Sequence, residues 1–401
     1  MNKKYLLYTF LPIILLQLQS CSSDDSNIEN LEILQLKDSY TGNRLTIIDI
    51  EPIGKATENT IFTWRMNDSV LANTKQLAFI SDKVGKYKVD LEIKTPQTSK
   101  VLSTNIIVQQ ESKPYSKYIA KVYDYAPAVG QFTNVYPAYE TGDTKEKMIE
   151  KASKAIVGSQ TSLLTLGGFG GYVVFGFDHT IMNKPNVRDF KILGNAFWGD
   201  AAEEARAGSC EPGIIMVAYD KNKNGKPDED EWYEIAGSEY HNPSTIKNYS
   251  ITYYKPEANH TPTPGPNGWD MDIRYIRWED NQGNTGYKTQ NIFNTQAYYP
   301  LWIPAKSITF SGTRLPDNFY DQSGVGNYWV GRSYAYGYAD NAPNNDEASN
   351  IDISWAVDKN GNYVHLPGID FIKVYTGINQ EAGWLGEVST EIIGAYDLHL
   401  N

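Results

Sequence analysis

The stretch "GIIMVAYDKNKNGKPDEDEWYEIAG" (residues 213–237) places two apolar runs on either side of an acidic loop. Both runs are short and rich in aliphatic and aromatic residues, so they predict strands rather than helices. Between them, residues 220–231 follow the spacing D-x-[DN]-x-[DN]-G, then five residues and Glu, which is the pattern of a calcium-binding loop. The stretch therefore predicts a β-hairpin whose connection carries the oxygen ligands that calcium prefers.

The loop supplies a nearly complete set of oxygen donors for one ion. The expected ligands are five side chains and one backbone carbonyl: Asp220, Asn222, Asn224, Asp228 and Glu231, with the carbonyl of Lys226. Gly225 permits the sharp turn around the ion. An ordinary hairpin with an Asn-Gly turn is the alternative, but such a turn does not require carboxylates at three of the outer positions. We therefore expect a structural calcium ion that stiffens the loop.

The first residues have the pattern of a processing signal. Lys3 and Lys4 precede the apolar run "LLYTFLPIILL", which is too short to cross a bilayer comfortably, and "LQSC" follows. The last four residues resemble a bacterial lipobox, so we expect residues 1–20 to be removed as a lipoprotein signal peptide and Cys21 to be lipidated. An ordinary signal peptide or a short membrane helix is the alternative. Residues 21–30 form an acidic tether whose "SSDD" resembles the export signal of Bacteroidetes surface lipoproteins, which predicts a lipid-anchored protein exposed on the outer membrane.

The rest of the chain divides into two predicted β domains. Residues 31–110 contain short strands with period-two alternation, and the Trp64 strand followed by "GKYKVDLEI" resembles an immunoglobulin-like or PKD-like sandwich that acts as a spacer. A polar join leads into a larger domain over residues 115–401. Strands dominate there, and residues 141–158 contain its one clear helix. The sequence therefore predicts a mainly β chain in which a small sandwich precedes a larger, jelly-roll-like β-sandwich that binds a ligand.

Composition excludes some functional classes. The 401 residues carry a net charge of −12, whereas a nucleic-acid-binding protein needs a basic face to neutralise phosphates. Only Cys210 remains once Cys21 is lipidated, so no intrachain disulfide or zinc cluster is possible, and a lone cysteine is usually a small buried hydrophobe. The five histidines lack the spacing of metal ligands.

The aromatic residues suggest where a ligand binds. The chain has 29 Tyr and 9 Trp, many of them in long loops rich in Gly and Asn, where rigid rings with polar tips form recognition surfaces. The candidate ligand-binding residues are Trp269, Tyr275, Trp278, Tyr328 and Trp329. Aromatic packing inside a large core is the alternative. The segment "ADNAPNND" (residues 339–346) is a candidate for a second calcium ion, with irregular spacing.

No catalytic residues are predicted. The glycine-rich stretch "GGFGGYVVFGFDH" (residues 167–179) lacks the lysine of a phosphate-binding loop, so its glycines are expected to allow close backbone approach. Serine residues lack a nucleophile elbow. Among many acidic residues, "WEDNQ" (residues 278–282) and "GWLGEVSTE" (residues 383–391) are the segments where a glycosidase carboxylate pair fits best. We expect a binding protein rather than an enzyme.

Several stretches of the larger domain carry a family resemblance. They are "GGYVVFGFDHTI", "DFKILGNAF", "EPGIIMVAYD", "WYEIAGS", "WAVDKNGNYVHLPGIDFIKVYTGIN" and "GWLGEVSTEIIGAYDL". The chain resembles the Bacteroidetes surface lipoproteins that join a PKD-like domain to a C-terminal cobamide-binding domain, the BtuH-like proteins. The resemblance implies capture of a cobamide (vitamin B12) and its delivery to an outer-membrane TonB-dependent transporter. A calcium-stabilised glycan-binding lipoprotein and a surface glycoside hydrolase are the alternatives.

The lipobox prediction is tested by replacing Cys21 with Ala. We expect the variant to leave the membrane fraction, because the thiol that carries the lipid is gone. Immunoblotting of soluble and membrane fractions measures the distribution, with Cys210→Ala as the matched control. Continued membrane association of Cys21→Ala would contradict the prediction.

Overall fold

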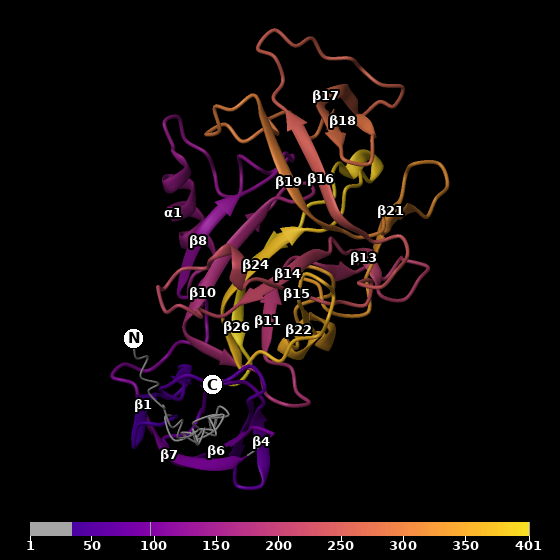
Figure 1. Cartoon of the computed structure of the whole chain (residues 1–401). Helices are drawn as coiled ribbons and strands as arrows, with labels where there is room; N and C mark the ends of the chain where they lie inside the picture. The colour runs from indigo at the N-terminus through magenta and orange to yellow at the C-terminus, as the bar shows by residue number, and fades with distance from the viewer. Residues whose placement is uncertain (1–33, 97, 401) are drawn as a thin grey trace, which may run out of the picture.

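The computed structural model describes residues 34–96 and 98–400, and strands form most of its regular secondary structure (Figure 1). In this part of the chain the one α-helix is α1 (Lys145–Ile156). The expectation of a mainly β fold with one clear helix is therefore confirmed. The predicted signal peptide, Cys21 and the acidic tether lie outside the described residues. Within residues 34–96 and 98–400, no helix has the length and apolarity needed to cross a membrane.

The strands near the N-terminus form a small sandwich with its own core. Its five-stranded sheet has the order β1 (Ser39–Asn43), β7 (Ser99–Gln109), β6 (Gly85–Lys94), β3 (Ile61–Met66) and β4 (Ser69–Ala72). A two-stranded sheet pairs β2 (Ile48–Ile50) with β5 (Leu77–Phe79). Along β6, alternate residues Val89, Leu91 and Ile93 are buried together with Trp64 of β3, as the period-two pattern predicts.

The remaining strands build the large upper body of Figure 1. Its central sheet has six strands in the order β23 (Ala356–Val357), β15 (Tyr233–Ile235), β14 (Gly213–Ala218), β24 (Gly368–Thr376), β10 (Tyr172–Met182) and β8 (Lys121–Ala126). A three-stranded sheet has the order β22 (Asn350–Ile351), β11 (Phe190–Leu193) and β26 (Gly394–Asp397). The predicted hairpin of the opening stretch is confirmed, because β14 pairs antiparallel with β15.

Three further sheets lie around this centre. One has the order β18 (Thr285–Asn291), β17 (Asp270–Asp280), β16 (Ile246–Tyr254) and β19 (Ser307–Arg314). Another has the order β12 (Phe197–Trp198), β13 (Ala207–Ser209), β21 (Trp329–Arg332) and β20 (Phe319–Asp321), and the smallest pairs β9 (Leu164–Thr165) with β25 (Glu391–Ile392). Short 3-10 helices complete the described elements: η2 (Glu229–Glu231), η3 (Glu347–Ser349), η4 (Ile353–Trp355) and η5 (Gly383–Leu385).

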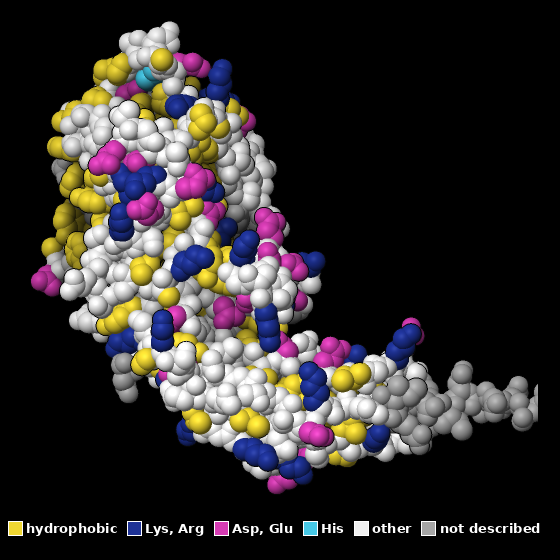
Figure 2. Space-filling view, turned by 90° about the vertical axis from the view of Figure 1, so that its left-hand side faces the viewer, with side chains coloured by type: hydrophobic (Ala, Val, Ile, Leu, Met, Phe, Trp, Pro, Cys, Tyr) yellow, Lys and Arg dark blue, Asp and Glu magenta, His cyan; other side chains and the backbone are white. Residues whose placement is uncertain are grey.

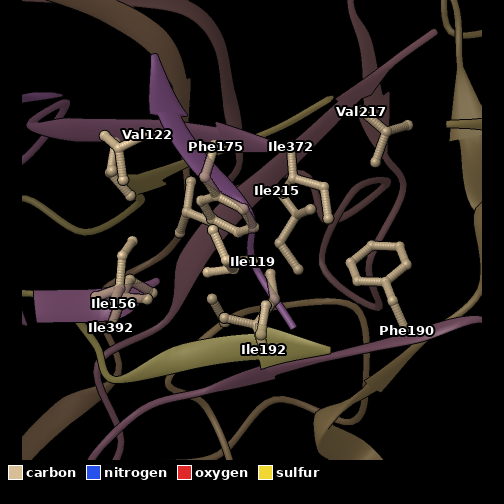
Figure 3. Packing of buried hydrophobic residues seen from close by; sticks show 14 of the residues in the cluster. Ile119, Val122, Ile156, Phe175, Phe190, Ile192, Ile215, Val217, Ile372 and Ile392 are labelled. Atoms are coloured by element: carbon tan, nitrogen blue, oxygen red, sulfur yellow. The ribbon is translucent and has the colours of Figure 1, made fainter. Parts of the chain in front are cut away.

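The main apolar core fills the space between the six-stranded and three-stranded sheets. Figure 3 shows Phe190 and Ile192 of β11 directed toward Ile215, Val217 and Ile372 of the central sheet. All five side chains are buried, so the two sheets share one dry interface, as in a sandwich. Helix α1 closes the edge of this core through its buried residues, Met148, Ala152, Ala155 and Ile156.

Polar contacts join the small sandwich to the large body. The backbone N–H of Thr180 donates to the carbonyl of Leu45 at 2.8 Å, and Lys184 Nζ lies 2.7 Å from a carboxylate oxygen of Asp82. A third contact comes from the acidic loop, where Lys223 Nζ lies 2.6 Å from a carboxylate oxygen of Asp49. The small sandwich is therefore held against the same end of the large body as the predicted calcium loop.

Candidate functional site

A cleft of about 490 Å³ opens in the large body where loops from several sheets meet. Its walls and floor come from segments far apart in the sequence. The residues that line the cleft include Gln131, Phe132, Tyr136, Asn195, Glu211, Phe293, Asn294, Trp384, Glu387, Ser389 and Glu391. Pockets of this size, with aromatic walls and a few convergent polar groups, are the usual form of a ligand site.

The "GWLGE" turn contributes Trp384 to the aromatic rim of the cleft. Gly383 and Gly386, with φ of +55° and +94°, bracket the turn η5 and adopt backbone conformations that favour glycine. The turn projects Trp384 so that 36% of it is exposed, and its ring meets that of Phe293 edge-on at 6.3 Å between centroids. The indole N–H donates to the carbonyl of Asn327 at 3.3 Å, which fixes the ring at the rim.

An amide network supports the same wall. The backbone N–H of Gln131 donates to Glu387 Oε1 at 2.6 Å, and its side-chain Nε2 donates to the carbonyl of Leu385 at 2.8 Å. Its Oε1 accepts hydrogen bonds from the side-chain amides of Asn291 (3.3 Å) and Asn294 (3.1 Å). The turn that carries Trp384 and Glu387 is thus fastened to loops from two other sheets.

Three acidic side chains meet at the floor of the cleft, where Glu211 and Glu391 belong to the lining and the buried Asp340 lies beside them. One carboxylate oxygen from each of Glu211, Asp340 and Glu391 lies within 4.8 Å of those of the other two. Glu211 precedes β14, Asp340 follows β21, and Glu391 begins β25. In the glycine-rich segment after β9 the backbone packs closely, because a Cβ on Gly171 would lie 1.9 Å from the carbonyl oxygen of Leu166 and 2.2 Å from the backbone nitrogen of Ala128. This close approach confirms the role predicted for those glycines.

Hydrogen bonds hold the floor carboxylates in place. Asp340 Oδ1 accepts from the backbone N–H groups of Asn195 and Ala196 at 2.9 and 2.8 Å, and its Oδ2 accepts from that of Glu391 at 2.9 Å. Glu391 Oε1 accepts from the hydroxyl groups of Thr165 (3.0 Å) and Ser389 (2.8 Å). The oxygens are therefore fixed by backbone and by short side chains rather than by flexible partners.

The acidic groups at the floor of the cleft are more stable when they are protonated or bind a cation than when all of them are charged. Burial raises the pKa of Glu211 and of Asp340 well above their ordinary values, and the Glu391 carboxylate raises both further. Burial also raises the pKa of Glu391. Beside them, burial raises the pKa of Glu387 to about 8. The cleft therefore contains four acidic groups that resist being charged together.

The predicted calcium loop forms a compact turn away from this cleft. Asp220 accepts from the backbone N–H groups of Asn224 (3.0 Å) and Gly225 (2.7 Å), and Gly225 has a φ of +72°. Both oxygens of Glu231 accept backbone hydrogen bonds, from Lys221 at 2.9 Å and from Asp228 at 3.3 Å. These contacts curl the chain around one point, as the sequence pattern predicts.

The donor set of the loop fits calcium, but its oxygens are turned toward protein donors. The Oδ1 atoms of Asn222 and Asn224 accept from backbone N–H groups, at 3.0 and 2.8 Å, and both side-chain amides donate to Asp228. The side chain of Lys226 is exposed. A bound ion would need these amides to rotate, so the ion itself stays a prediction.

The five aromatic residues predicted to bind a ligand lie outside the cleft lining. Tyr275 and Trp278 of β17 pack against an apolar cluster, and the ring of Tyr275 meets that of Tyr298 edge-on at 5.3 Å. Trp269 lies just before β17. Tyr328 is exposed, and Trp329 donates from its indole N–H to the carbonyl of Gly326 at 3.2 Å. Trp329 also lies under Gly383, so it supports the cleft rim from behind.

Other predicted positions have local structural roles. Asp280 of "WEDNQ" accepts hydrogen bonds from Tyr249 and from the following turn. In "ADNAPNND", Asp340 joins the cleft floor, whereas Asp346 caps η3, so the oxygens of that segment serve separate partners. Cys210 is buried, and burial raises the pKa of its thiol to about 12, which agrees with the prediction of an inert side chain.

The sequence contained partial signals for the cleft. The segment "GWLGEVSTE" supplies Trp384, Glu387 and Glu391, and it is one of the two segments where a glycosidase carboxylate pair would fit best, although none is predicted. The segment "ADNAPNND" supplies Asp340. Sequence reasoning missed Glu211 and Gln131, because nothing in the local pattern shows that these residues meet the other segments in space.

Comparisons with known proteins give limited help. No family model matches the chain, and no curated protein matches it. Solved structures with some likeness include the SusE-like protein BT2857, which is 10% identical with a TM-score of 0.28 and matches 91% of this chain and 96% of that chain. A structure of carbohydrate-binding modules from the β-sandwich superfamily is 8% identical with a TM-score of 0.16, over 91% of this chain and 96% of that chain.

A third likeness covers less of the chain. A quinonprotein alcohol dehydrogenase-like protein (BT1487) from Bacteroides thetaiotaomicron is 12% identical with a TM-score of 0.17, over 50% of this chain and 44% of that chain. All three TM-scores are low, so the likenesses carry no argument about function. The function has to be argued from the site.

The calcium loop prediction is tested with Asp220→Ala combined with Glu231→Ala. We expect calcium to raise the melting temperature of the parent protein more than that of the variant, because the variant lacks two carboxylate ligands of the loop. Scanning calorimetry in calcium and in chelator measures the calcium-dependent rise. Glu229→Gln with Asp230→Asn is the matched control, because both side chains are exposed loop acids outside the ligand positions. An equal rise in parent and double-alanine variant would contradict the prediction.

The raised pKa of Glu387 predicts a pH dependence of stability. Its pKa lies at about 8 in the folded protein against 4.5 ordinarily, so between those pH values the folded state holds a proton that the unfolded state releases. The free energy of unfolding therefore falls as pH rises through this window, by at most about 1.4 kcal/mol per pH unit. Glu387→Gln should flatten the fall.

Urea denaturation in chelator at pH 5, 6, 7 and 8 measures this effect. Glu257→Gln is the control, because that side chain is exposed and should leave the pH dependence unchanged. Parallel curves for the parent and for Glu387→Gln would show that the carboxyl is not buried as described.

Proposed function

We propose that the protein is a surface lipoprotein that captures a glycan in the Trp384 cleft. The observation that supports this function best is the combination of an aromatic rim with acid and amide groups below it. Sugar rings carry C–H groups on their faces, which pack on aromatic rings, and hydroxyl groups around their edges, which hydrogen-bond to carboxyl and amide groups. Trp384 and Phe293 supply the first kind of contact, while Asn294 and Glu387 supply the second.

Size and charge agree with a neutral, polar ligand. A cleft of about 490 Å³ is suited to a small part of a glycan chain rather than to a macromolecule. The described lining residues include no Lys or Arg, so a phosphate or carboxylate ligand would lack a counter-charge. On the face shown in Figure 2, acidic and basic side chains are interspersed rather than gathered into a basic patch.

Capture of a cobamide is the second candidate, and one observation favours it. Three of the stretches that resemble BtuH-like proteins converge on this cleft, since they supply Asn195, Glu211 and the segment 383–391. A corrin is larger than the cleft, so it would lie across the rim, with its peripheral amides reaching inward. In either case we propose that the lipid anchor at Cys21 holds the protein on the outer membrane and that a TonB-dependent transporter receives the ligand.

Binding is tested on the chain from residue 22 with a glycan array, followed by calorimetric titration of the best glycan and of cyanocobalamin. We expect saturable binding to a glycan, and we expect Trp384→Ala to weaken it about tenfold or more because the ring that stacks on the sugar is lost. Tyr363→Ala is the matched control, because this exposed tyrosine lies outside the cleft lining.

The outcomes separate the candidate functions. Binding of cyanocobalamin alone, weakened by Trp384→Ala, would favour the cobamide reading. Binding that Trp384→Ala leaves unchanged would place the ligand elsewhere, and the proposed use of the cleft would be wrong. Release of reducing sugar from a bound glycan, abolished by Glu387→Gln, would show a hydrolase instead of a binding protein.

A further inference from the structure

We infer that Glu211, Asp340 and Glu391 form a divalent-cation site for calcium at the floor of the Trp384 cleft. This site is separate from the Asp220 loop. The inference deepens the proposed function, on which it rests for the ligand, because a calcium ion there would offer open coordination positions to the hydroxyl groups of a bound sugar.

The three carboxylates are placed as ligands of one ion would be. Their nearest oxygens all lie within 4.8 Å of one another, a spread that is consistent with calcium–oxygen distances of about 2.3–2.6 Å. Backbone N–H groups of Asn195, Ala196 and Glu391 hold Asp340, and the backbone N–H of Ser389 donates to Glu211 Oε1 at 3.1 Å. The oxygens are therefore positioned before any ion binds.

A second observation points to something bound in the same cleft. Glu387 is only 7% exposed and lines the cleft together with Glu211 and Glu391. Its Oε1 accepts from the backbone N–H of Gln131, whereas its Oε2 is buried and has no hydrogen-bond partner among the described residues. Buried polar atoms are rarely left without partners, and none of the described residues partners this oxygen, which belongs to a side chain that lines the same cleft as Glu211 and Glu391.

Charge balance supports the same conclusion. Several other buried acidic side chains have a cationic partner: Glu111 lies 2.5 Å from Arg44, Asp352 lies 2.7 Å from Arg188, and Asp397 lies 2.9 Å from His179. For Glu211, Asp340 and Glu391, the described residues provide no such ion pair. Several buried carboxylates without a cation are costly. A divalent ion would neutralise the cluster without requiring it to bind extra protons.

The donor chemistry selects the kind of ion. The cluster offers oxygen ligands, which hard cations such as calcium prefer over softer metals. The nearby Cys210 thiol is directed toward the carbonyl oxygen of Phe197, so it does not add a sulfur ligand. The three carboxylates leave positions open toward the cleft, since calcium takes six to eight oxygens. Calcium would thus join the acidic floor to the sugar.

The test counts bound calcium on the full soluble chain. After chelator treatment, calorimetric titration with calcium chloride is compared for the parent, for Glu211→Gln, and for Asp220→Ala with Glu231→Ala. We expect Glu211→Gln to bind one calcium fewer than the parent, and the loop variant to retain the cleft ion. Asp317→Asn is the matched control, because its exposed carboxylate pairs with Arg314 on the surface.

Circular dichroism shows whether each variant is folded, and Glu391→Gln is a second variant of the cleft site. If Glu211→Gln is misfolded, the count is taken from Glu391→Gln, whose amide keeps the shape of the side chain. A calcium count equal to that of the parent in a folded cleft variant overturns the inference.

Different experimental results would contradict this inference and the proposed function. Glycan binding that persists in chelator, with no calcium bound in the cleft, would contradict the calcium site and support the proposed function. Calcium bound in the cleft without any glycan binding would support the calcium site and contradict the proposed function. If both are right, chelator weakens glycan binding of the loop variant about tenfold or more, because the ion in the cleft contacts the ligand.

Discussion

The cost of burying acidic groups together dominates the candidate site. Glu211, Asp340 and Glu391 share a floor where burial and mutual repulsion raise the pKa of the first two well above ordinary values. A protein keeps such an arrangement only where hydrogen bonds, protons or a cation offset the cost. In this chain, backbone N–H groups supply hydrogen bonds to the carboxylates. The proposed calcium ion would supply the positive charge.

The fold brings Glu391 to the cleft beside a segment with close backbone packing. Strand β25, which contains Glu391, pairs with β9, and the glycine-rich turn that follows β9 approaches the backbone of residues 128 and 166 too closely for any side chain. The segment just before β14 supplies Glu211, and a loop after β21 supplies Asp340. The cleft is therefore a product of the long-range packing of the sheets, and its precise shape depends on that packing.

The sequence predicted local features well and the site only in fragments. Period-two alternation identified β6, the hairpin of β14 and β15 followed from the apolar runs around residues 220–231, and the helix was found within residues 141–158. These features depend on neighbours in the chain. The cleft depends on segments more than a hundred residues apart, so composition could not distinguish Trp384, which forms its rim, from Tyr275 and Trp278, which pack inside.

The central claim is that the cleft floor is built to hold positive charge beside a ligand. A crystal structure of the protein grown in calcium, with anomalous scattering data collected at long wavelength, tests it most directly. The account predicts an anomalous peak about 2.3–2.6 Å from oxygens of Glu211, Asp340 and Glu391. A floor with no peak, in which the three carboxyl groups hydrogen-bond only to one another and to water, would contradict it.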